Sequence, residues 1–332
     1  MTRSSQVPVL ALAVPGLALG GGVPEVARFL LGVALGTGRY NVRLVSLATE
    51  AGDRQSVRLA SPRTWLQGAQ TAHGTWEGYP FVHAGAMAAE FEFQRYHPRR
   101  ALAHALDDCD AVQVVCGSPA WANAVLGLRK PVSLHVATRA RIERRRRNAR
   151  PGSALGWWRR AMTEATDRLD DRALRRVDAI QVMNPWMLEY ARALNAGRDV
   201  DIRHAPPGVD EVLFRPPPAD GPARDRSVLC VGRLDDPRKN VGMLLQAFAL
   251  LPEAIRRDAR LVLAGSSLPT PEFHARARAL RIADRVECVS APPRDALVRL
   301  YQRASAFALP SDEEGFGMVL VEAMACGVPV VA

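Results

Sequence analysis

Short apolar runs, each followed by a turn and a segment with helical periodicity, occur in two series along the chain. Continuous apolar runs of this length are typical of strands that are buried on both faces of a parallel sheet. The first series is residues 9–14, 42–47, 111–115, 131–134 and 179–183, and the second is residues 228–231, 261–264, 286–289, 306–309 and 330–331. Alternation of this kind predicts an α/β fold with open, doubly wound sheets.

A segment rich in proline and polar residues separates the two series. It contains Pro206-Pro207-Gly208, three prolines at 216–218 and the polar residues 220–226. This composition is typical of a boundary between domains. The sequence therefore predicts two Rossmann-like domains, residues 1–205 and 206–332, that face each other across a cleft. Residues 51–89 are polar and irregular, and no element is predicted for them.

Charge and cysteine content restrict the partners and the location of the chain. Its 44 Lys and Arg exceed its 34 Asp and Glu, which gives a formal charge of +10. That charge suits a polyanionic ligand, an anionic membrane face or nucleic acid. No nucleic-acid-binding motif accompanies it, so we expect no nucleic-acid partner. The five cysteines are scattered without CxxC spacing, which predicts reduced thiols, a cytoplasmic chain and no zinc site.

The apolar run at the N-terminus allows two interpretations. Arg3 followed by residues 7–22 could be a secretory signal. Pro15 and the three glycines at 20–22 interrupt the run, and an amphipathic helical pattern follows, so we favour a buried first strand and a glycine-rich loop. Such a loop can present a helix N-terminus to an anion or a sugar, although a simple tight turn explains it equally well. No other segment is long enough to span a membrane.

A histidine and a cluster of aspartates lie at opposite ends of their predicted strands. His135 ends the run at 131–134, and ligands of open α/β sheets bind at carboxyl ends; a lone histidine can also be purely structural. Asp107, Asp108 and Asp110 precede their strand. We therefore expect them to form a solvated loop at the amino end of the sheet rather than a metal site.

A basic tract follows the strand that ends at His135. Arginines occupy positions 139, 141, 144–147 and 150, and Trp157-Trp158-Arg159-Arg160 come shortly after. The tract from Arg139 to Arg150 can be a solvated segment. It can also bind an anionic surface, such as a membrane leaflet or an acidic acceptor, and tryptophan beside arginine suits a membrane interface. The sequence leaves both interpretations open.

The last residues of the chain combine a loop, a helix and one acid. Glu314-Gly315-Phe316-Gly317 indicates a loop, and residues 317–325 have helical composition before Gly327 and Pro329 stop the helix. Glu322 is the one charge on a helix that is apolar nearly all round, so we expect that helix to be buried. A buried carboxylate needs a partner. A core acid satisfied by a backbone group and a ligand-binding acid both fit.

This closing segment and two earlier segments resemble a known family. The segments are Pro207-Gly208-Val209-Asp210, Val231-Gly232-Arg233-Leu234 with Lys239, and Glu314-Gly-Phe-Gly-Met-Val-Leu-Val-Glu322-Ala-Met-Ala-Cys-Gly-Val-Pro-Val-Val-Ala. In them the second half of the chain is similar to the retaining glycosyltransferases of the GT-B fold, glycosyltransferase family 4 (glycosyl transferases group 1). The first half matches more loosely, through the glycines at 20–22 and His135, with Val136 where the family often has an acid.

The resemblance implies transfer of a hexose from a nucleotide diphosphate sugar to a hydroxyl of a glycan, a lipid or a small molecule. It implies retention of the anomeric configuration and no cofactor or metal, because Arg233 and Lys239 would stabilise the departing diphosphate. Catalytic roles are implied for Arg233, Lys239, Glu314 and His135. Donor contacts are implied for Gly21, Gly22, Gly232, Val289, Ser290, Gly315, Phe316, Gly317, Met318, Val319 and Glu322.

Particular contacts follow from the same resemblance. Glu314 and the backbone of residues 315–317 would contact the donor sugar, and Glu322 would bond the ribose hydroxyls. The backbone of residues 289–291 would contact the base. His135 would meet the primary hydroxyl of the sugar, and the glycine loop at 20–22 would lie by the phosphate and the acceptor.

Two other classes remain as alternatives. Glu314 and Glu322 could be the carboxylate pair of a glycoside hydrolase, although the neighbouring cations suit a phosphate leaving group better. A non-catalytic or weakly active sugar-nucleotide-binding scaffold is the other alternative. The resembled family continues beyond Ala332 with further helices, so we expect the second domain to be truncated and its activity to be low.

Overall fold

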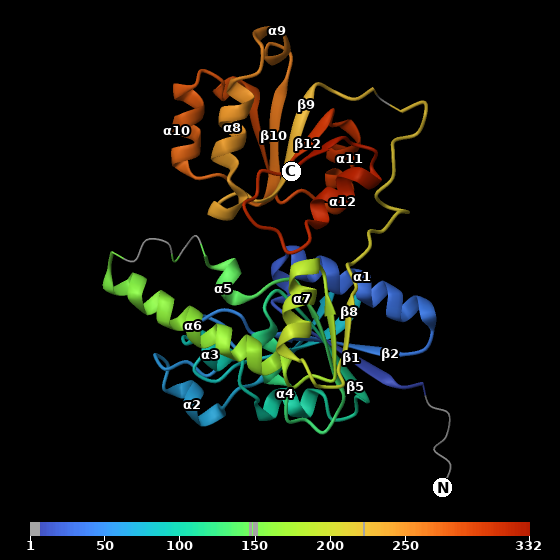
Figure 1. Cartoon of the computed structure of the whole chain (residues 1–332), viewed down its shortest axis with the longest axis vertical. Helices are drawn as coiled ribbons and strands as arrows, with labels where there is room; N and C mark the ends of the chain where they lie inside the picture. The colour runs from blue at the N-terminus through green and yellow to red at the C-terminus, as the bar shows by residue number, and fades with distance from the viewer. Residues whose placement is uncertain (1–6, 146–147, 149–151, 222) are drawn as a thin grey trace. The chain divides into compact units, whose positions relative to one another are not determined.

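The computed structural model describes residues 7–145, 148, 152–221 and 223–332. The chain divides into two compact units, Met1–Pro207 and Gly208–Ala332, and each is described by itself (Figure 1). Both units contain a sheet of mainly parallel strands with helices around it, which confirms the predicted α/β fold with two Rossmann-like parts. Within the described residues, no helix is both long and apolar enough to cross a membrane.

Unit 1 has one eight-stranded sheet in the order β3-β4-β2-β1-β5-β6-β7-β8. All neighbouring strands are parallel except β3 and β4, which form an antiparallel hairpin at the edge. The first series of apolar runs supplies five of these strands. The eight are β1 (Val9–Pro15), β2 (Asn41–Leu47), β3 (Thr71–Trp76), β4 (Tyr79–Ala84), β5 (Ala111–Cys116), β6 (Val132–Val136), β7 (Ala179–Val182) and β8 (Asp201–His204).

The hairpin falls in the segment for which no element was predicted. Its turn consists of Glu77 and Gly78, which both have positive φ, the backbone required in a tight two-residue hairpin. In β3, exposed residues alternate with half-buried ones, as expected for an edge strand. This alternation around an acidic residue and a glycine is the sequence signal that could have predicted the hairpin.

The helices of unit 1 connect its parallel strands. The longest, α6, is capped by Ser153, whose hydroxyl accepts a hydrogen bond from Gly156 N–H at 3.2 Å. This helix was not predicted, since the arginines and tryptophans around its start obscured the helical pattern. The helices are α1 (Gly22–Thr37), α2 (Arg63–Gln67), α3 (Glu92–Arg95), α4 (Arg100–Ala105), α5 (Ala140–Glu143), α6 (Ala154–Leu174) and α7 (Pro185–Leu194).

Unit 2 has five parallel strands in the order β11-β10-β9-β12-β13. In chain order this is 3-2-1-4-5, the order of a Rossmann fold. The strands are β9 (Ser227–Arg233), β10 (Arg260–Ser267), β11 (Val286–Ser290), β12 (Ala306–Ala308) and β13 (Val330–Val331). The helices are α8 (Val241–Ala249), α9 (Glu253–Arg256), α10 (Pro271–Ala279), α11 (Arg294–Arg303) and α12 (Met318–Ala325).

Both faces of the unit 2 sheet are covered, so its central strand is buried on both sides. Leu229 and Val231 of β9 belong to a cluster with Tyr301 of α11 and Ala323 of α12. Cys230, between them in sequence, belongs to another cluster with residues of α8 and α10. Successive side chains of a strand point to opposite faces, which is why this strand is a continuous apolar run.

Candidate functional site

The strand order of unit 2 reverses between β9 and β12. Open α/β sheets bind ligands at such a switch point, beyond the carboxyl ends of the strands. Arg233 is the last residue of β9, Lys239 lies in the loop that follows it, and the loop after β12 carries Glu314. The two loops are joined by a hydrogen bond from Asp312 N–H to the Arg238 carbonyl, at 2.9 Å. The fold therefore brings three of the four predicted catalytic residues to the point where a ligand is expected.

Lys239 and Glu314 form an ion pair between the two loops. The Lys239 ammonium donates to a carboxylate oxygen of Glu314, and both side chains are mostly buried. The Lys239 stem lies against Gly232, where a Cβ atom would come within 3.5 Å of Lys239 Cε. The lysine stem is thus packed against the end of β9, and Glu314 holds its ammonium at the switch point.

Asp236 organises the rest of the loop after β9 and was not predicted from the sequence. It accepts hydrogen bonds from the Arg238 backbone at 3.0 Å and the Arg238 guanidinium at 2.8 Å, and it pairs with Arg233 at 3.2 Å. Burial raises the pKa of Asp236, but the hydrogen bonds from Arg238 outweigh it, so the pKa lies below its ordinary value. Asp236 is thus an ionised anchor beside Arg233, whose own side chain is half exposed.

The loop after β12 leads into the N-terminus of α12. Gly317 immediately precedes the helix and has a φ of 84°, which glycine adopts without strain. A Cβ atom there would also come within 3.0 Å of Leu320 Cδ1. Free backbone N–H groups at a helix N-terminus attract anions. Residues 315–319 therefore place an anion-attracting helix start beside Glu314.

Glu322 has a side-chain partner inside the protein that was not predicted from the sequence. Its side chain is 4% exposed, and its Oε2 accepts a hydrogen bond from the hydroxyl of fully buried Tyr301, at 2.8 Å. Burial and the nearby Glu322 raise the pKa of Tyr301 well above its ordinary value, which keeps the hydroxyl a donor. A side chain from α11 thus satisfies one oxygen of this carboxylate. The contact of Glu322 with a ribose stays a prediction.

The helix that carries Glu322 is less buried than its composition predicted. Glu322 and Ala323 are buried, but Met324 on the same helix is exposed. The prediction of a helix buried all round was therefore wrong. An apolar helix can lie at the rim of a sheet, with only one side against the core, and periodicity does not reveal this.

Replacing Tyr301 by phenylalanine tests whether the tyrosine orients Glu322. The loss of a buried hydrogen bond to a carboxylate is expected to cost about 1–3 kcal/mol of unfolding free energy. If Glu322 also binds the ligand, the dissociation constant of a nucleoside diphosphate should rise several-fold. Thermal unfolding and titration calorimetry measure the two effects separately. A purely structural role would lower stability without changing affinity, and Tyr40→Phe at an exposed tyrosine of unit 1 is the control.

Val289 and Ser290 end the edge strand β11, and β10 separates that strand from β9. Ala291, next in sequence, donates its N–H to the Gly265 carbonyl at 2.7 Å. That N–H is therefore already used, so the expected contact of the 289–291 backbone with a base must rely on other groups. Gly265 is itself essential to the packing, because a Cβ atom there would lie 1.8 Å from the Gly232 carbonyl oxygen.

Two predicted features of unit 1 lie at carboxyl ends of its sheet. Gly21, just before α1, has a φ of 101°, a conformation open to glycine, and Gly22 begins the helix. His135 of β6 is fully buried, and its Nε2 lies 2.8 Å from the Ala205 carbonyl, to which it donates. Burial lowers the pKa of His135, so the ring is a neutral imidazole. Its contact with a sugar hydroxyl stays a prediction.

Most described arginines of the 139–150 tract form internal ion pairs. Arg139 bonds Asp167 at 2.8 Å and Asp171 at 2.9 Å, and its guanidinium stacks 3.9 Å from the Tyr190 ring centroid. Arg141 pairs with Glu164 at 3.1 Å, and Arg144 pairs with Glu92. Three of the four described arginines of the tract are thus paired with acids of the same unit, and binding of the tract to an anionic surface stays a prediction. Residues 146, 147 and 149–151 lie outside the described part of the chain.

A pocket of about 260 Å³ lies at the carboxyl ends of β2 and β4. Among the side chains that line it, His83 bridges Asp53 at 2.8 Å and Ser46 at 3.1 Å. Burial raises the pKa of Asp53, but hydrogen bonds from His83 and Ser56 outweigh it and keep the pKa below its ordinary value. The pocket therefore combines an ionised carboxylate with an imidazole and hydroxyls.

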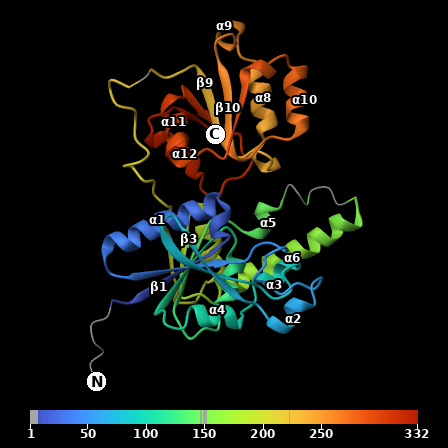
Figure 2. The same cartoon turned by 180° about the vertical axis from the view of Figure 1, so that it is seen from behind.

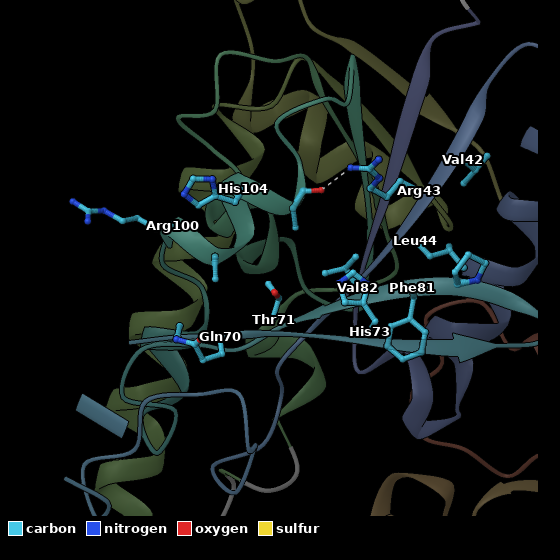
Figure 3. A pocket seen from close by; sticks show the side chains of 14 residues that line it. Val42, Arg43, Leu44, Gln70, Thr71, His73, Phe81, Val82, Arg100 and His104 are labelled. Carbon is cyan, nitrogen blue, oxygen red and sulfur yellow. Dashed lines mark hydrogen bonds between the residues drawn. The ribbon is translucent and has the colours of Figure 1, made fainter. Parts of the chain in front are cut away.

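A larger pocket of about 710 Å³ lies between α4 and strands β2, β3 and β4 (Figure 3). Figure 3 shows Arg43 bonded to a backbone carbonyl beside this pocket. Arg43 also pairs with Asp108, and His104 lies 3.3 Å from Asp107. The β2 residues that line the pocket belong to the amino-terminal half of the strand. This pocket is therefore away from the carboxyl ends where ligands of such sheets bind, and the aspartate cluster lies at the amino end as predicted.

The second half of the chain resembles known proteins. Residues 218–332 match the family described as "Glycosyl transferases group 1". A segment of the chain is 42% identical over 147 residues to a D-inositol 3-phosphate glycosyltransferase of Mycolicibacterium gilvum, covering 40% of this chain and 31% of that protein. Another is 35% identical over 181 residues to a GDP-mannose-dependent alpha-(1-6)-phosphatidylinositol monomannoside mannosyltransferase of Mycolicibacterium smegmatis, covering 48% of this chain and 46% of that protein. The matches therefore span less than half of either relative.

The fold of the whole chain matches solved glycosyltransferase structures. Sucrose-phosphate synthase from Thermosynechococcus elongatus aligns with a TM-score of 0.69 at 20% identity, over 97% of this chain and 80% of that one. WaaG, a glycosyltransferase involved in lipopolysaccharide biosynthesis, aligns with a TM-score of 0.63 at 18% identity, over 97% and 80%. The chain thus has the GT-B fold, and residues 218–332 are a glycosyl transferases group 1 domain.

Proposed function

We propose that the chain is a retaining, metal-independent glycosyltransferase that moves a hexose from a nucleotide diphosphate sugar to an acceptor hydroxyl. The observation that carries the proposal is the meeting of Arg233, Lys239 and Glu314 with the start of α12 at the β9–β12 switch point. Two cations and a helix N-terminus suit a diphosphate, and a carboxylate suits sugar hydroxyls. The GDP-mannose dependence named for one relative supports a nucleotide-sugar donor.

The chemistry of the site follows from these groups. As the sugar–phosphate bond breaks, negative charge grows on the diphosphate, and preorganised cations stabilise it. Lys239 is already held by Glu314, so diphosphate oxygens can take over the ammonium while the freed carboxylate accepts from a sugar hydroxyl. These cations supply the charge stabilisation that a metal ion would otherwise provide.

Retention requires the acceptor hydroxyl to attack on the face from which the diphosphate leaves. The new bond forms between the acceptor oxygen and the anomeric carbon as the bond to the phosphate oxygen breaks. The transition state is oxocarbenium-like, and a phosphate oxygen of the leaving group takes the proton of the acceptor. No protein nucleophile is required in this scheme.

We infer that unit 1 binds the acceptor. The pocket at the carboxyl ends of β2 and β4 offers the Asp53 carboxylate, the His83 imidazole and neighbouring hydroxyls. These groups suit a compound with several hydroxyls, such as a glycan or the head of a glycolipid. We place this reaction in the cytoplasm, because the five cysteines are all free thiols and reduced thiols are typical there.

A glycoside hydrolase and a non-catalytic binder would each use Glu314 and Glu322 differently from a glycosyltransferase. A glycoside hydrolase would need Glu314 and Glu322 open to a water and a glycosidic oxygen. Glu322 is buried and bonded to Tyr301, and Glu314 is paired with Lys239. A non-catalytic binder would keep the donor site without turnover, so a transfer assay with a labelled donor separates it from an enzyme.

A thermal-shift screen with UDP, GDP and ADP tests the donor site. A nucleotide at a hundred times its dissociation constant stabilises the native state by about 2.7 kcal/mol. For a domain of this size we expect the melting temperature to rise by roughly 5–10 °C with the preferred nucleotide. The matching monophosphate, which lacks the second phosphate, is the control. If no diphosphate shifts the melting temperature more than its monophosphate, the proposed site is wrong.

A further inference from the structure

The first turns of α6 leave the body of unit 1. Both views show this end of the helix extending away from the sheet (Figures 1 and 2). Leu155 is 55% exposed, Trp157 65% and Trp158 51%, whereas Thr166, Asp170 and Ala173 further along the helix are buried. One helix therefore anchors itself in the unit with its second half and presents two tryptophans and a leucine to solvent with its first. We name residues 154–161 the α6 tip.

The charges around the α6 tip are of one sign. The sequence contains no Asp or Glu between Glu143 and Glu164, and Arg159 and Arg160 follow the tryptophans directly. Arg159 is exposed, and so is Arg145 near the end of α5. Arg160 is held in place by a hydrogen bond to the Asn148 carbonyl, at 3.0 Å, with its guanidinium 5.8 Å from the Trp157 ring centroid. The tip thus joins aromatic rings to cations within a stretch, residues 144–163, whose sequence contains no acid.

The arrangement of the apolar side chains indicates which partner the tip fits. With about 100° between successive helical residues, Leu155 and Trp158 share one side of the helix, whereas Trp157 lies roughly 160° around the helix from Leu155. A protein groove that took up the Leu155 and Trp158 side would leave Trp157 in water. A lipid surface surrounds the helix end that enters it, so apolar groups on both sides of the tip are buried together. Tryptophan rings and arginines are also the residues that favour the membrane–water interface.

We propose that the α6 tip binds an anionic lipid surface. Trp157, Trp158 and Leu155 enter the interface while Arg159 and Arg145 contact lipid phosphates. The membrane contact is thus centred on α6. Arg145 contributes to it from the Arg139–Arg150 tract, whose Arg139, Arg141 and Arg144 form ion pairs within the unit. Asp167 and Asp171 of α6 accept from Arg139, so the tract fixes the direction in which the tip projects.

Vesicle binding tests the proposal. The full chain is mixed with vesicles of equal parts phosphatidylglycerol and phosphatidylcholine, or of phosphatidylcholine alone, and bound protein is separated by flotation. We expect binding to the anionic vesicles, with a blue shift of tryptophan emission, and weaker binding as salt is raised because surface charges are screened. Trp157→Ser with Trp158→Ser should weaken binding by at least about tenfold, since two aromatic side chains lose their apolar environment. Arg159→Gln should weaken binding to anionic vesicles only.

Two controls show whether a change in vesicle binding is specific to the α6 tip. Trp65→Ser removes a similarly exposed tryptophan from α2 and should leave vesicle binding unchanged. Each variant should keep the wild-type melting temperature and nucleotide-dependent thermal shift, since the proposed diphosphate-binding residues Arg233 and Lys239 lie in unit 2. Wild-type protein that does not float with anionic vesicles overturns the proposal. A double tryptophan variant that floats as the wild type does also overturns the proposal. Loss of self-association by this variant in the absence of lipid overturns it too, because the tip would then be an interface between copies of this chain.

Discussion

Replacing Lys239 by alanine is expected to lower the rate of glycosyl transfer by about a hundredfold or more, because one preorganised charge on the leaving diphosphate is lost. The variant also leaves Glu314 without the ammonium that it bonds in the unliganded site. Repulsion between this carboxylate and the diphosphate should remove most of the nucleotide-dependent rise in melting temperature. Initial rates with a labelled nucleotide sugar and melting curves with the preferred diphosphate measure the two effects.

A matched variant separates this loss from a general effect of charge. Arg226 lies in the same unit and forms an exposed ion pair with Asp258, so Arg226→Ala should keep both the rate and the thermal shift. Lys239→Arg should keep part of the nucleotide affinity, since a guanidinium also binds phosphate. Turnover by Lys239→Ala near the wild-type rate would remove Lys239 from the proposed mechanism.

Replacing Asp170 by asparagine is expected to destabilise unit 1 by about 3 kcal/mol, because a buried amide group would face a backbone donor. One oxygen of this fully buried carboxyl accepts from the Ser118 hydroxyl and from Ala120 N–H at 2.7 Å. The other accepts from Ala140 N–H at 2.8 Å. Asp170 thus fixes α6 to the chain on both sides of β6. For a unit of this size the melting temperature should fall by roughly 6–12 °C.

The pH dependence of the melting temperature tests the role of Asp170 in a second way. Burial raises the pKa of Asp170 to about 7 despite its hydrogen bonds. Since this is above the value of roughly 4 expected in the unfolded chain, the folded state binds the proton more tightly. The stabilisation that comes from the tighter proton binding of Asp170 in the folded state is fully present below about pH 4 and is lost as the pH rises through 7. The difference in melting temperature between the native protein and Asp170→Asn should therefore widen from pH 7 to pH 5. Asp199→Asn, at an exposed aspartate, should show neither effect.

Much of the fold follows from local sequence pattern. A strand buried on both faces is a continuous apolar run, so the core strands of both units are visible in the sequence. Elements that lack this pattern were missed: β3 and β4 have an exposed side, and β8 is a short edge strand. The α6 helix was missed because its first turns, which are exposed, do not show an apolar stripe.

The donor-site residues were predicted in part. Arg233, Lys239 and Glu314 lie in motifs, so their place at carboxyl ends followed from the order of strands. The side chains that these residues contact could not be predicted from the sequence. Lys239 meets Glu314 across a separation of 75 residues, and Tyr301 meets Glu322 only because α11 and α12 pack on the same face of the sheet. Asp236 is adjacent to the predicted residues, but a single aspartate in a polar loop carries no distinguishing signal.

The sequence by itself determined the α/β class, the central strands and the loops that carry the charged motif residues, because periodicity and turn residues are properties of neighbouring positions. Only the tertiary structure decided which charges are free and which are used. It placed Arg139, Arg141 and Arg144 in internal ion pairs, and it left Trp157 and Trp158 exposed on α6. An arginine looks the same in the sequence whether it faces lipid, phosphate or an aspartate; the acid that neutralises it is brought there by the packing of the chain.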